Sequence, residues 1–185
     1  MGKLNKRKCK NCKKEFQKTK PLQYVCSVNC AIEYSRKKDI EKAKKESREK
    51  TKKAKDKLKT YSQRVQEART IFQKYIRLRD KHQNCICCNE PESTYWDAGH
   101  FYKAELFSGV IFNEDNCHKQ RRYCNRYLGG NEREYRIGLE KKIGIENIEQ
   151  LQKLANETRQ YKYSNEELEE IKVKYRKKIK ELLSK

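Results

Sequence analysis

The sequence lacks any long hydrophobic run, and only 35% of its 185 residues are hydrophobic. No apolar stretch approaches the roughly 20 residues that a membrane-spanning helix needs. The first residues, Met1 onward, form no apolar signal region. We therefore expect a cytoplasmic protein. So few apolar residues argue against one large core and favour small modules that need additional stabilisation, such as bound metal.

Acidic residues are also scarce relative to basic ones. The chain has 26 Asp and Glu against 47 Lys and Arg, which gives a formal net charge of +21. Such self-repulsion disfavours a compact state. A polyanionic partner explains the excess, and nucleic acid fits better than a membrane surface.

The nine cysteines do not form a complete set of pairs, because their number is odd. In a reducing compartment, metal ligands or free thiols are favoured over disulfides. Cys9-x-x-Cys12 and Cys26-x-x-x-Cys30 are spaced as two pairs that converge on one tetrahedral zinc ion. The alternative is four free thiols in a basic tail. We predict a four-cysteine zinc finger over residues 1–34.

Glycine and proline are both absent from Ala31 to His82, which favours a continuous helix. Residues 36–59 hold thirteen Lys or Arg and five Asp or Glu, so this part cannot bury an apolar face. We predict a basic helical linker or arm over residues 35–82. It is either a solvated spacer or a phosphate-binding arm. If it is an arm, the candidate phosphate contacts are Lys42, Lys44, Lys45, Lys52 and Lys53.

Apolar residues return at helical spacing toward the end of this stretch and again near the C-terminus. The first series predicts one packed face, and comprises Leu58, Tyr61, Val65, Ala68, Phe72 and Tyr75. Residues 137–185 are expected to be helical, with a break at Gly144. Ser164-x-x-Glu167 is a capping box that starts the last helix. Its apolar stripe comprises Leu168, Ile171, Tyr175, Ile179 and Leu182.

Residues 83–136 are predicted to form a compact α+β centre. Two short strands are expected at 95–101 and 109–112, followed by a helix after Asn116 that ends near Gly129 and Gly130. The fold class is thus mostly α with a small α+β centre, of the ββα-metal (HNH, His-Me finger) type.

The centre contains an arrangement of residues suited to phosphodiester hydrolysis. His100 is the candidate general base, because a neutral, oriented imidazole can take a proton from water. Asn116 would buttress the neighbouring loop or orient the imidazole. Asn125 and Asp97 are candidate ligands of Mg²⁺ or Mn²⁺, which prefer hard oxygen donors. His118 could contact phosphate, ligate a metal, or only pack in the core.

A second zinc site is expected in the same region. Cys85, Cys88 and Cys124 supply three thiolates, and a structural zinc normally takes four ligands. Cys117 is the nearest candidate for the fourth, with His118 and Cys87 as alternatives. The site would otherwise be weakened or lost.

These residues resemble the NinG (Rap) recombination proteins of lambdoid phages. The resemblance rests on five short stretches, namely Cys85-Ile86-Cys87-Cys88, residues 96–101, residues 112–120, Cys124-Asn125 and residues 130–136. It implies a zinc-containing, structure-selective endonuclease that uses a divalent cation on Holliday junctions, D-loops and flaps. It also implies action in the host bacterial cell alongside phage recombination proteins. Two residues depart from the family pattern, because Arg121 replaces a cysteine and no lysine stands near Leu128. Arg121, Arg122 and Arg126 are candidate DNA contacts that could compensate for the missing lysine.

Two other functions remain open. The chain could be a zinc-containing accessory protein that binds branched DNA without cutting it. It could also bind RNA, with unpaired bases stacked on exposed aromatic residues. The combination of His100, Asn116 and Asn125 favours the nuclease. A homodimer is left open, because the long helix could pair two chains.

Overall fold

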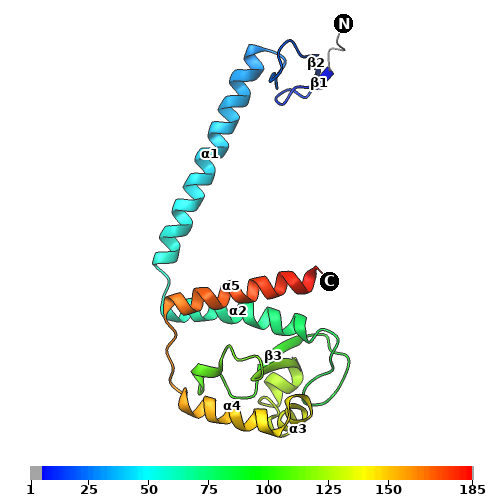
Figure 1. Cartoon of the computed structure of the whole chain (residues 1–185), viewed down its shortest axis with the longest axis vertical. Coiled ribbons are helices and arrows are strands. Elements are labelled where there is room, and N and C mark those ends of the chain that lie inside the picture. Colours follow the sequence, from blue (N-terminus) through cyan, green and yellow to red (C-terminus); the bar gives the residue numbers. More distant parts are fainter. Residues whose placement is uncertain (1–5, 185) are drawn as a thin grey trace. The chain divides into compact units, whose positions relative to one another are not determined.

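The computed structural model describes residues 6–184, so the first five residues of the predicted finger and Lys185 lie outside it. The chain divides into two compact units, Met1–Lys59 and Thr60–Lys185. Figure 1 labels the five α-helices and strands β1, β2 and β3. Within residues 6–184, no helix is long and apolar enough to cross a membrane.

The first unit contains a small hairpin and a long polar helix. Strands β1 (Lys6–Lys8) and β2 (Glu15–Gln17) pair antiparallel. Helix α1 (Val28–Lys57) begins at Ser27, whose side chain accepts a hydrogen bond from the backbone N–H of Cys30. No residue of α1 is buried. The prediction that this stretch cannot bury an apolar face is therefore confirmed.

The predicted continuous helix from Ala31 to His82 is wrong. Helix α1 ends at Lys57, and helix α2 (Tyr61–Arg79) starts anew after a short break. Thr60 and Gln63 form a reciprocal capping box that begins α2 without any glycine or proline. Because the compact units divide after Lys59, α2 belongs to the second unit and not to a linker that extends to residue 82.

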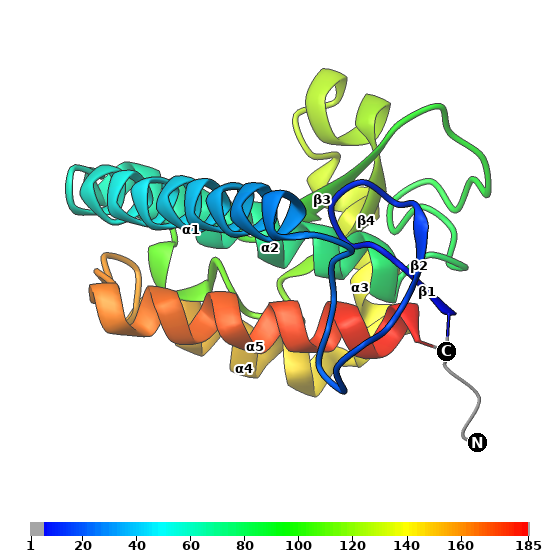
Figure 2. The ribbon, with the colours of Figure 1, turned by 90° about the horizontal axis from the view of Figure 1, so that it is seen from above.

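Helices α2 and α5 (Asn165–Leu183) form one layer of the second unit (Figures 1 and 2). Phe72 of α2 and Tyr175 of α5 pack edge to face, with ring centroids 4.9 Å apart. The predicted α2 face is confirmed at Ala68, Phe72 and Tyr75, which are buried. It is wrong at Leu58 and Tyr61, which are 82% and 40% exposed. The predicted apolar stripe of α5 and its capping box are confirmed.

Strands β3 (Trp96–His100) and β4 (Cys117–Arg121) pair antiparallel and place His100 opposite Cys117. The predicted strand at 109–112 is wrong, because residues 108–110 form the short 3₁₀ helix η1 (Ser108–Val110). The predicted helix after Asn116 begins only after residue 121, because the segment that directly follows Asn116 is β4. The strand could not be predicted from the sequence, because its residues do not alternate between polar and apolar. Its polar side chains are buried with hydrogen-bonding partners.

A π-helix, η2 (Tyr123–Tyr127), follows β4 and ends before Gly129 and Gly130, as predicted for the helix stop. Both glycines have positive φ, which glycine adopts without strain. Helices α3 (Glu132–Ile143) and α4 (Ile145–Glu157) then form the other layer, and the predicted break at Gly144 is confirmed. The two strands lie between the helical layers (Figure 1).

Candidate functional site

His100 lies at the end of β3, where its ring packs near Phe72 of α2 with centroids 6.3 Å apart. Its Nε2 is 2.9 Å from the carbonyl oxygen of Ile111. Because a carbonyl only accepts, Nε2 carries the hydrogen, and Nδ1 is left with the free lone pair. Burial lowers the pKa of His100 to about 4. The imidazole is therefore neutral at neutral pH, as a general base must be.

His100 lines a small pocket of about 200 Å³. Asn125 reaches this pocket from η2. The other lining residues are Arg69, Gln73, Ala98, Gly99, Lys103, Ala104 and Glu105. Sequence reasoning missed Arg69, because it lies on α2 and only the tertiary fold brings it here. Lys103 and Glu105 were also missed, although they follow His100 closely along the chain.

Gly99 allows Asn125 to approach β3 closely. A Cβ atom at this position would lie 1.9 Å from Oε1 of Gln120 and 3.3 Å from Oδ1 of Asn125. Any side chain here would force Gln120 to move and crowd the asparagine. The glycine is thus required by space, and it keeps the Asn125 amide beside the strand that carries His100.

Asp97 lies on β3 but does not line the pocket. Its carboxylate accepts hydrogen bonds from Nδ2 of Asn125 and Nε of Arg126, both at 3.1 Å, and lies 3.5 Å from Arg122. Burial alone would raise the pKa of Asp97, but these donors outweigh it and lower the pKa below its usual value. The ionised carboxylate therefore orients the Asn125 amide, leaving Oδ1 of Asn125 free to accept.

Asn116 is completely buried and clamps the loop between the two strands. Its Oδ1 accepts from the Tyr102 N–H at 2.7 Å, and its Nδ2 donates to the carbonyls of Tyr102 at 3.1 Å and Val110 at 3.0 Å. The same loop carries Ile111, the partner of His100. Of the two roles left open for Asn116, the structure shows the loop buttress, since its amide bonds the loop backbone and not the imidazole.

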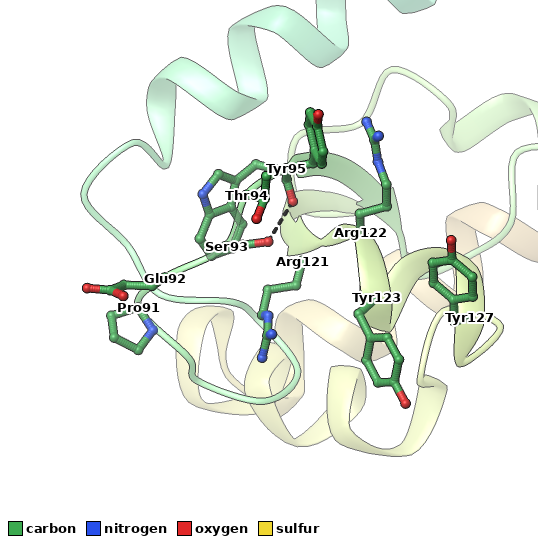
Figure 3. A pocket seen from close by; sticks show the side chains of 10 residues that line it. Pro91, Glu92, Ser93, Thr94, Tyr95, Arg121, Arg122, Tyr123 and Tyr127 are labelled. Atoms are coloured by element: carbon green, nitrogen blue, oxygen red, sulfur yellow. Dashed lines mark hydrogen bonds between the residues drawn. The ribbon is translucent and has the colours of Figure 1, made fainter.

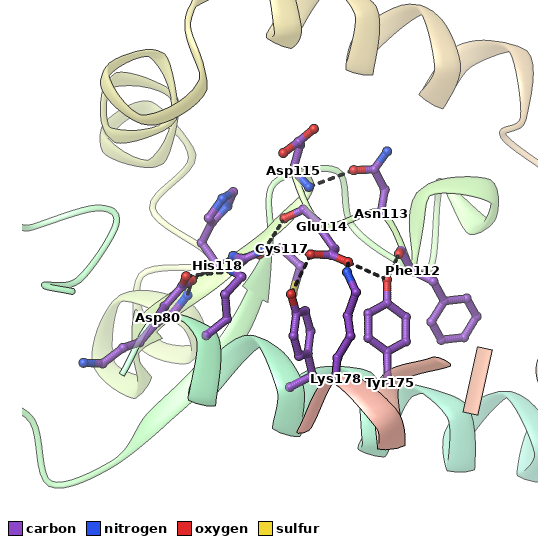
Figure 4. Close-up of polar contacts among 12 residues, drawn as sticks. Asp80, Phe112, Asn113, Glu114, Asp115, Cys117, His118, Tyr175 and Lys178 are labelled. Carbon is purple, nitrogen blue, oxygen red and sulfur yellow. Dashed lines mark hydrogen bonds and ion pairs between the residues drawn. The ribbon is translucent and has the colours of Figure 1, made fainter. Parts of the chain in front are cut away.

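The segment before β4 is fixed to the helical layer by a second polar cluster, drawn in Figure 4. Glu114 accepts from the hydroxyls of Tyr75 at 2.8 Å and Tyr175 at 3.3 Å, and pairs with Lys178. Arg79 donates to the carbonyls of Glu114 and of Cys117. Sequence reasoning assigned these tyrosines to the apolar face and missed their hydrogen bonds.

His118 lies in the core and not in the pocket. Its side chain is 1% exposed, and its Nδ1 is 3.3 Å from the hydroxyl of Tyr135, which in turn donates to the Gly99 carbonyl. Burial lowers its pKa to about 3. The cation or phosphate contact considered for His118 has no support in this geometry, and packing is its observed role.

The first cysteine cluster comes together as predicted. The sulfur atoms of Cys9, Cys12, Cys26 and Cys30 all lie within 4.8 Å of one another. The hairpin region supplies the first two, and the segment that starts α1 supplies the others. Four convergent sulfurs are the ligand set of a structural zinc ion.

The second cluster contains Cys85, Cys88 and Cys124, again within 4.8 Å of one another. The predicted fourth ligand, Cys117, is wrong. Cys117 is completely buried in the core formed with α2, because the β4 register places it beside His100, at the far end of the strand from Arg121.

The other possible ligands do not complete the second cluster. Gln120 donates to the sulfur of Cys87 at 2.8 Å, and Cys87 stays outside the group of three. Arg121 also lies against this cluster, with its Nη1 3.9 Å from the Cys88 sulfur. Among residues 6–184, no His, Cys, Asp or Glu side chain joins these three cysteines.

The candidate DNA contacts fall in two places. The five lysines are all exposed on α1. In the second unit, Arg122 and Arg126 pair with Asp97, and Arg121 lies against Cys88. The arginines therefore have structural partners as well as exposed surface.

Comparison with known proteins gives one consistent result. The family model described as bacteriophage lambda NinG protein matches residues 1–185. The protein named NinG from Escherichia phage lambda is 33% identical over 98% of this chain and 96% of its own length. Those from Salmonella phage P22 and Escherichia phage 933W are 32% and 34% identical, with the same coverage. No solved structure matches.

Proposed function

Since the chain belongs to the NinG family of phage proteins, we propose that it is a metal-dependent endonuclease that cuts branched DNA during homologous recombination. The observation that carries this proposal is the state of His100. Its Nε2 is committed to a backbone carbonyl, its pKa is about 4, and its ring lines a pocket with Asn125. A histidine that served only packing would not need a polar pocket beside it.

In this proposal, His100 takes a proton from water through Nδ1 as the water oxygen attacks the phosphorus of the scissile phosphate. The bond from phosphorus to the leaving sugar oxygen breaks, and that oxygen takes up a proton from solvent. Asn116 keeps the imidazole in place indirectly, because it fixes the loop that holds the Ile111 carbonyl. Arg69 and Lys103 line the same pocket and supply positive charge near the phosphoryl oxygens. Preorganised charge of this kind stabilises the transition state.

The pocket also offers oxygen donors suited to Mg²⁺ or Mn²⁺. Asn125 Oδ1 and the Glu105 carboxylate are the candidate ligands, and Asp97 would act behind Asn125 by orienting it. Two protein oxygens are enough, because Mg²⁺ keeps several waters and often binds through one or two protein groups plus substrate phosphates. When bound, the cation would neutralise the phosphoryl oxygens and assist the leaving oxygen.

Cleavage of labelled DNA with and without Mg²⁺ or Mn²⁺ tests this proposal. The substrates are Holliday junctions, D-loops and flaps, with linear duplex of the same length and sequence as the control. We expect metal-dependent cutting of the branched molecules and little cutting of the duplex. Tight binding to the junctions without cutting in either metal would instead support the accessory protein, which is the remaining alternative.

We further propose that α1 binds DNA phosphates. Replacing Lys42, Lys44, Lys45, Lys52 and Lys53 by glutamine is expected to weaken binding to every DNA substrate. The plot of the logarithm of the binding constant against the logarithm of the salt concentration should also become less steep. Its slope should fall by about 0.9 for each duplex phosphate contact that is lost. Binding titrations at several salt concentrations measure both effects.

A control variant comes from the same helix. Glu41, Glu46 and Glu49 are also exposed, and replacing them by glutamine removes negative charge instead. That variant should bind DNA at least as tightly as wild type. An unchanged salt slope in the lysine variant would show that α1 is a solvated spacer.

A further inference from the structure

A wide groove of about 910 Å³ lies on the second unit, apart from the His100 pocket. Residues 91–96, which lead into β3, line one part of it. The rest is lined by residues 121–123 and Tyr127, from the end of β4 and from η2. Figure 3 shows these side chains, with Tyr95, Tyr123 and Tyr127 around the two arginines at positions 121 and 122. We call this surface the tyrosine groove.

The tyrosines of the groove are unusually open for such large rings. Tyr95 is 58% exposed, Tyr123 is 56% exposed and Tyr127 is 77% exposed. Tyr123 and Tyr127 stack on each other, with centroids 5.9 Å apart and ring planes 27° apart. Single exposed aromatics are ordinary, but three in one groove form a platform with free ring faces.

The charge of the groove is positive. Two arginines and one acidic residue, Glu92, line it. The Arg122 guanidinium lies 4.4 Å from the centre of the Tyr95 ring, and its ion pair with Asp97 is long at 3.5 Å. A guanidinium has five N–H donors, and the Nε of Arg122 is buried without a partner, so the donors open to an anion are those of the Nη atoms that do not face Asp97.

The groove is linked to the His100 pocket by shared elements. The π-helix η2 carries Tyr123 and Tyr127 on the groove and Asn125 in the pocket. Strand β3 begins at Trp96 in the groove and ends at His100 in the pocket. Over this strand length the two sites are roughly 13 Å apart. This separation is short enough for one polynucleotide to span.

We propose that the tyrosine groove binds the unpaired nucleotides of a branched DNA. Unpaired bases would stack on the open tyrosine rings, and Arg121 and Arg122 would bind the adjoining phosphates. Intact duplex cannot use the groove in this way, because its base faces are covered by neighbouring base pairs. Binding there would also bring the branch point close to the His100 pocket and so select the cleavage site. That consequence rests on the proposed nuclease function, whereas the binding itself does not.

Equilibrium binding by the full-length protein tests the proposal without relying on cleavage. The probes are a forked DNA with an unpaired arm and a blunt duplex of equal length, measured without added Mg²⁺ or Mn²⁺. The double variant Tyr123→Leu, Tyr127→Leu should bind the fork at least about fivefold more weakly, which corresponds to about 1 kcal/mol. Its affinity for the duplex should change by less than about twofold.

Two further variants show whether the ring itself matters. Tyr123→Phe with Tyr127→Phe keeps both rings and should bind the fork like wild type. Tyr61→Leu removes an exposed tyrosine of α2 that lies outside the groove, and should have no effect. All these side chains are exposed, so the variants should fold normally.

An equal loss of affinity for fork and duplex, or no loss for either, would overturn the proposal. A tyrosine-dependent preference for a single-stranded RNA of the same sequence over the DNA arm would overturn it in favour of RNA binding. If the fork-specific loss occurs in a protein that never cuts DNA, the groove stands and the nuclease proposal fails.

Discussion

Replacing His100 by alanine is expected to slow cleavage of branched DNA at least about 100-fold while DNA affinity changes by less than about twofold. The imidazole is the one neutral base in the pocket, with Nδ1 left free by the bond from Nε2 to Ile111. Removing it takes away the proton acceptor for the attacking water but none of the arginines or lysines that hold phosphate. Single-turnover cleavage and equilibrium binding on the same junction separate the two effects.

His82→Ala is the matched control, because His82 is exposed and outside the pocket, and it should cut like wild type. His100→Gln tests whether shape alone suffices. Glutamine can still donate to the Ile111 carbonyl but cannot accept a proton at neutral pH. The variant should therefore fold normally and remain inactive. A comparable loss of DNA binding in both His100 variants would argue against a catalytic role.

The pH dependence of cleavage gives a further readout of the same base. Burial lowers the pKa of His100 from 6.5 to about 4, so the neutral form persists in acid and is lost only as the pH falls toward 4. The cleavage rate should therefore hold down to about pH 5.5, where a histidine of ordinary pKa would be mostly protonated. A decline centred near pH 6.5 would contradict the burial of this base.

Replacing Cys12 by serine is expected to release one zinc ion and unfold the first cysteine module. Among residues 6–30, the four sulfurs are the only convergent metal ligands, and the β1–β2 hairpin has three residues in each strand. Structural zinc sites of this kind supply on the order of 10–16 kcal/mol of folding free energy at neutral pH. Zinc content by mass spectrometry and amide hydrogen exchange over residues 6–30 measure the loss.

The effect should stay within the first unit, because the chain divides after Lys59. Cys12 is exposed, so the change to serine removes a ligand with little loss of packing. Cys117→Ser is the matched control. It places a hydroxyl in the core and lowers stability, but it should leave the zinc content unchanged, because Cys117 lies outside both clusters. Unchanged zinc in the Cys12 variant, or zinc loss in the Cys117 variant, would refute these assignments.

Much of the local structure could be read from the sequence. The Ser164 capping box, the apolar stripe of α5, the break at Gly144 and the polar character of α1 each depend on residues close together in the chain. The first cysteine cluster was also readable, because a metal site imposes a recognisable ligand spacing. His100 and Asn125 were found in the same way, from short motifs.

Tertiary structure decided the remainder. Strand β4 carries polar side chains that are buried with partners from distant segments, as the carbonyls of Lys81 and Gln83 are for the Lys119 ammonium. The register of β4 against β3 turned Cys117 into the core and left Arg121 beside the second cysteine cluster. Asp97 and His118 lie outside the pocket. Asp97 instead pairs with Arg126, and His118 contacts the hydroxyl of Tyr135. Local pattern fixes helices, caps and ligand spacing because those interactions span a few residues. The direction in which a side chain points, and the partner that it contacts, depend on pairing between segments far apart in the sequence.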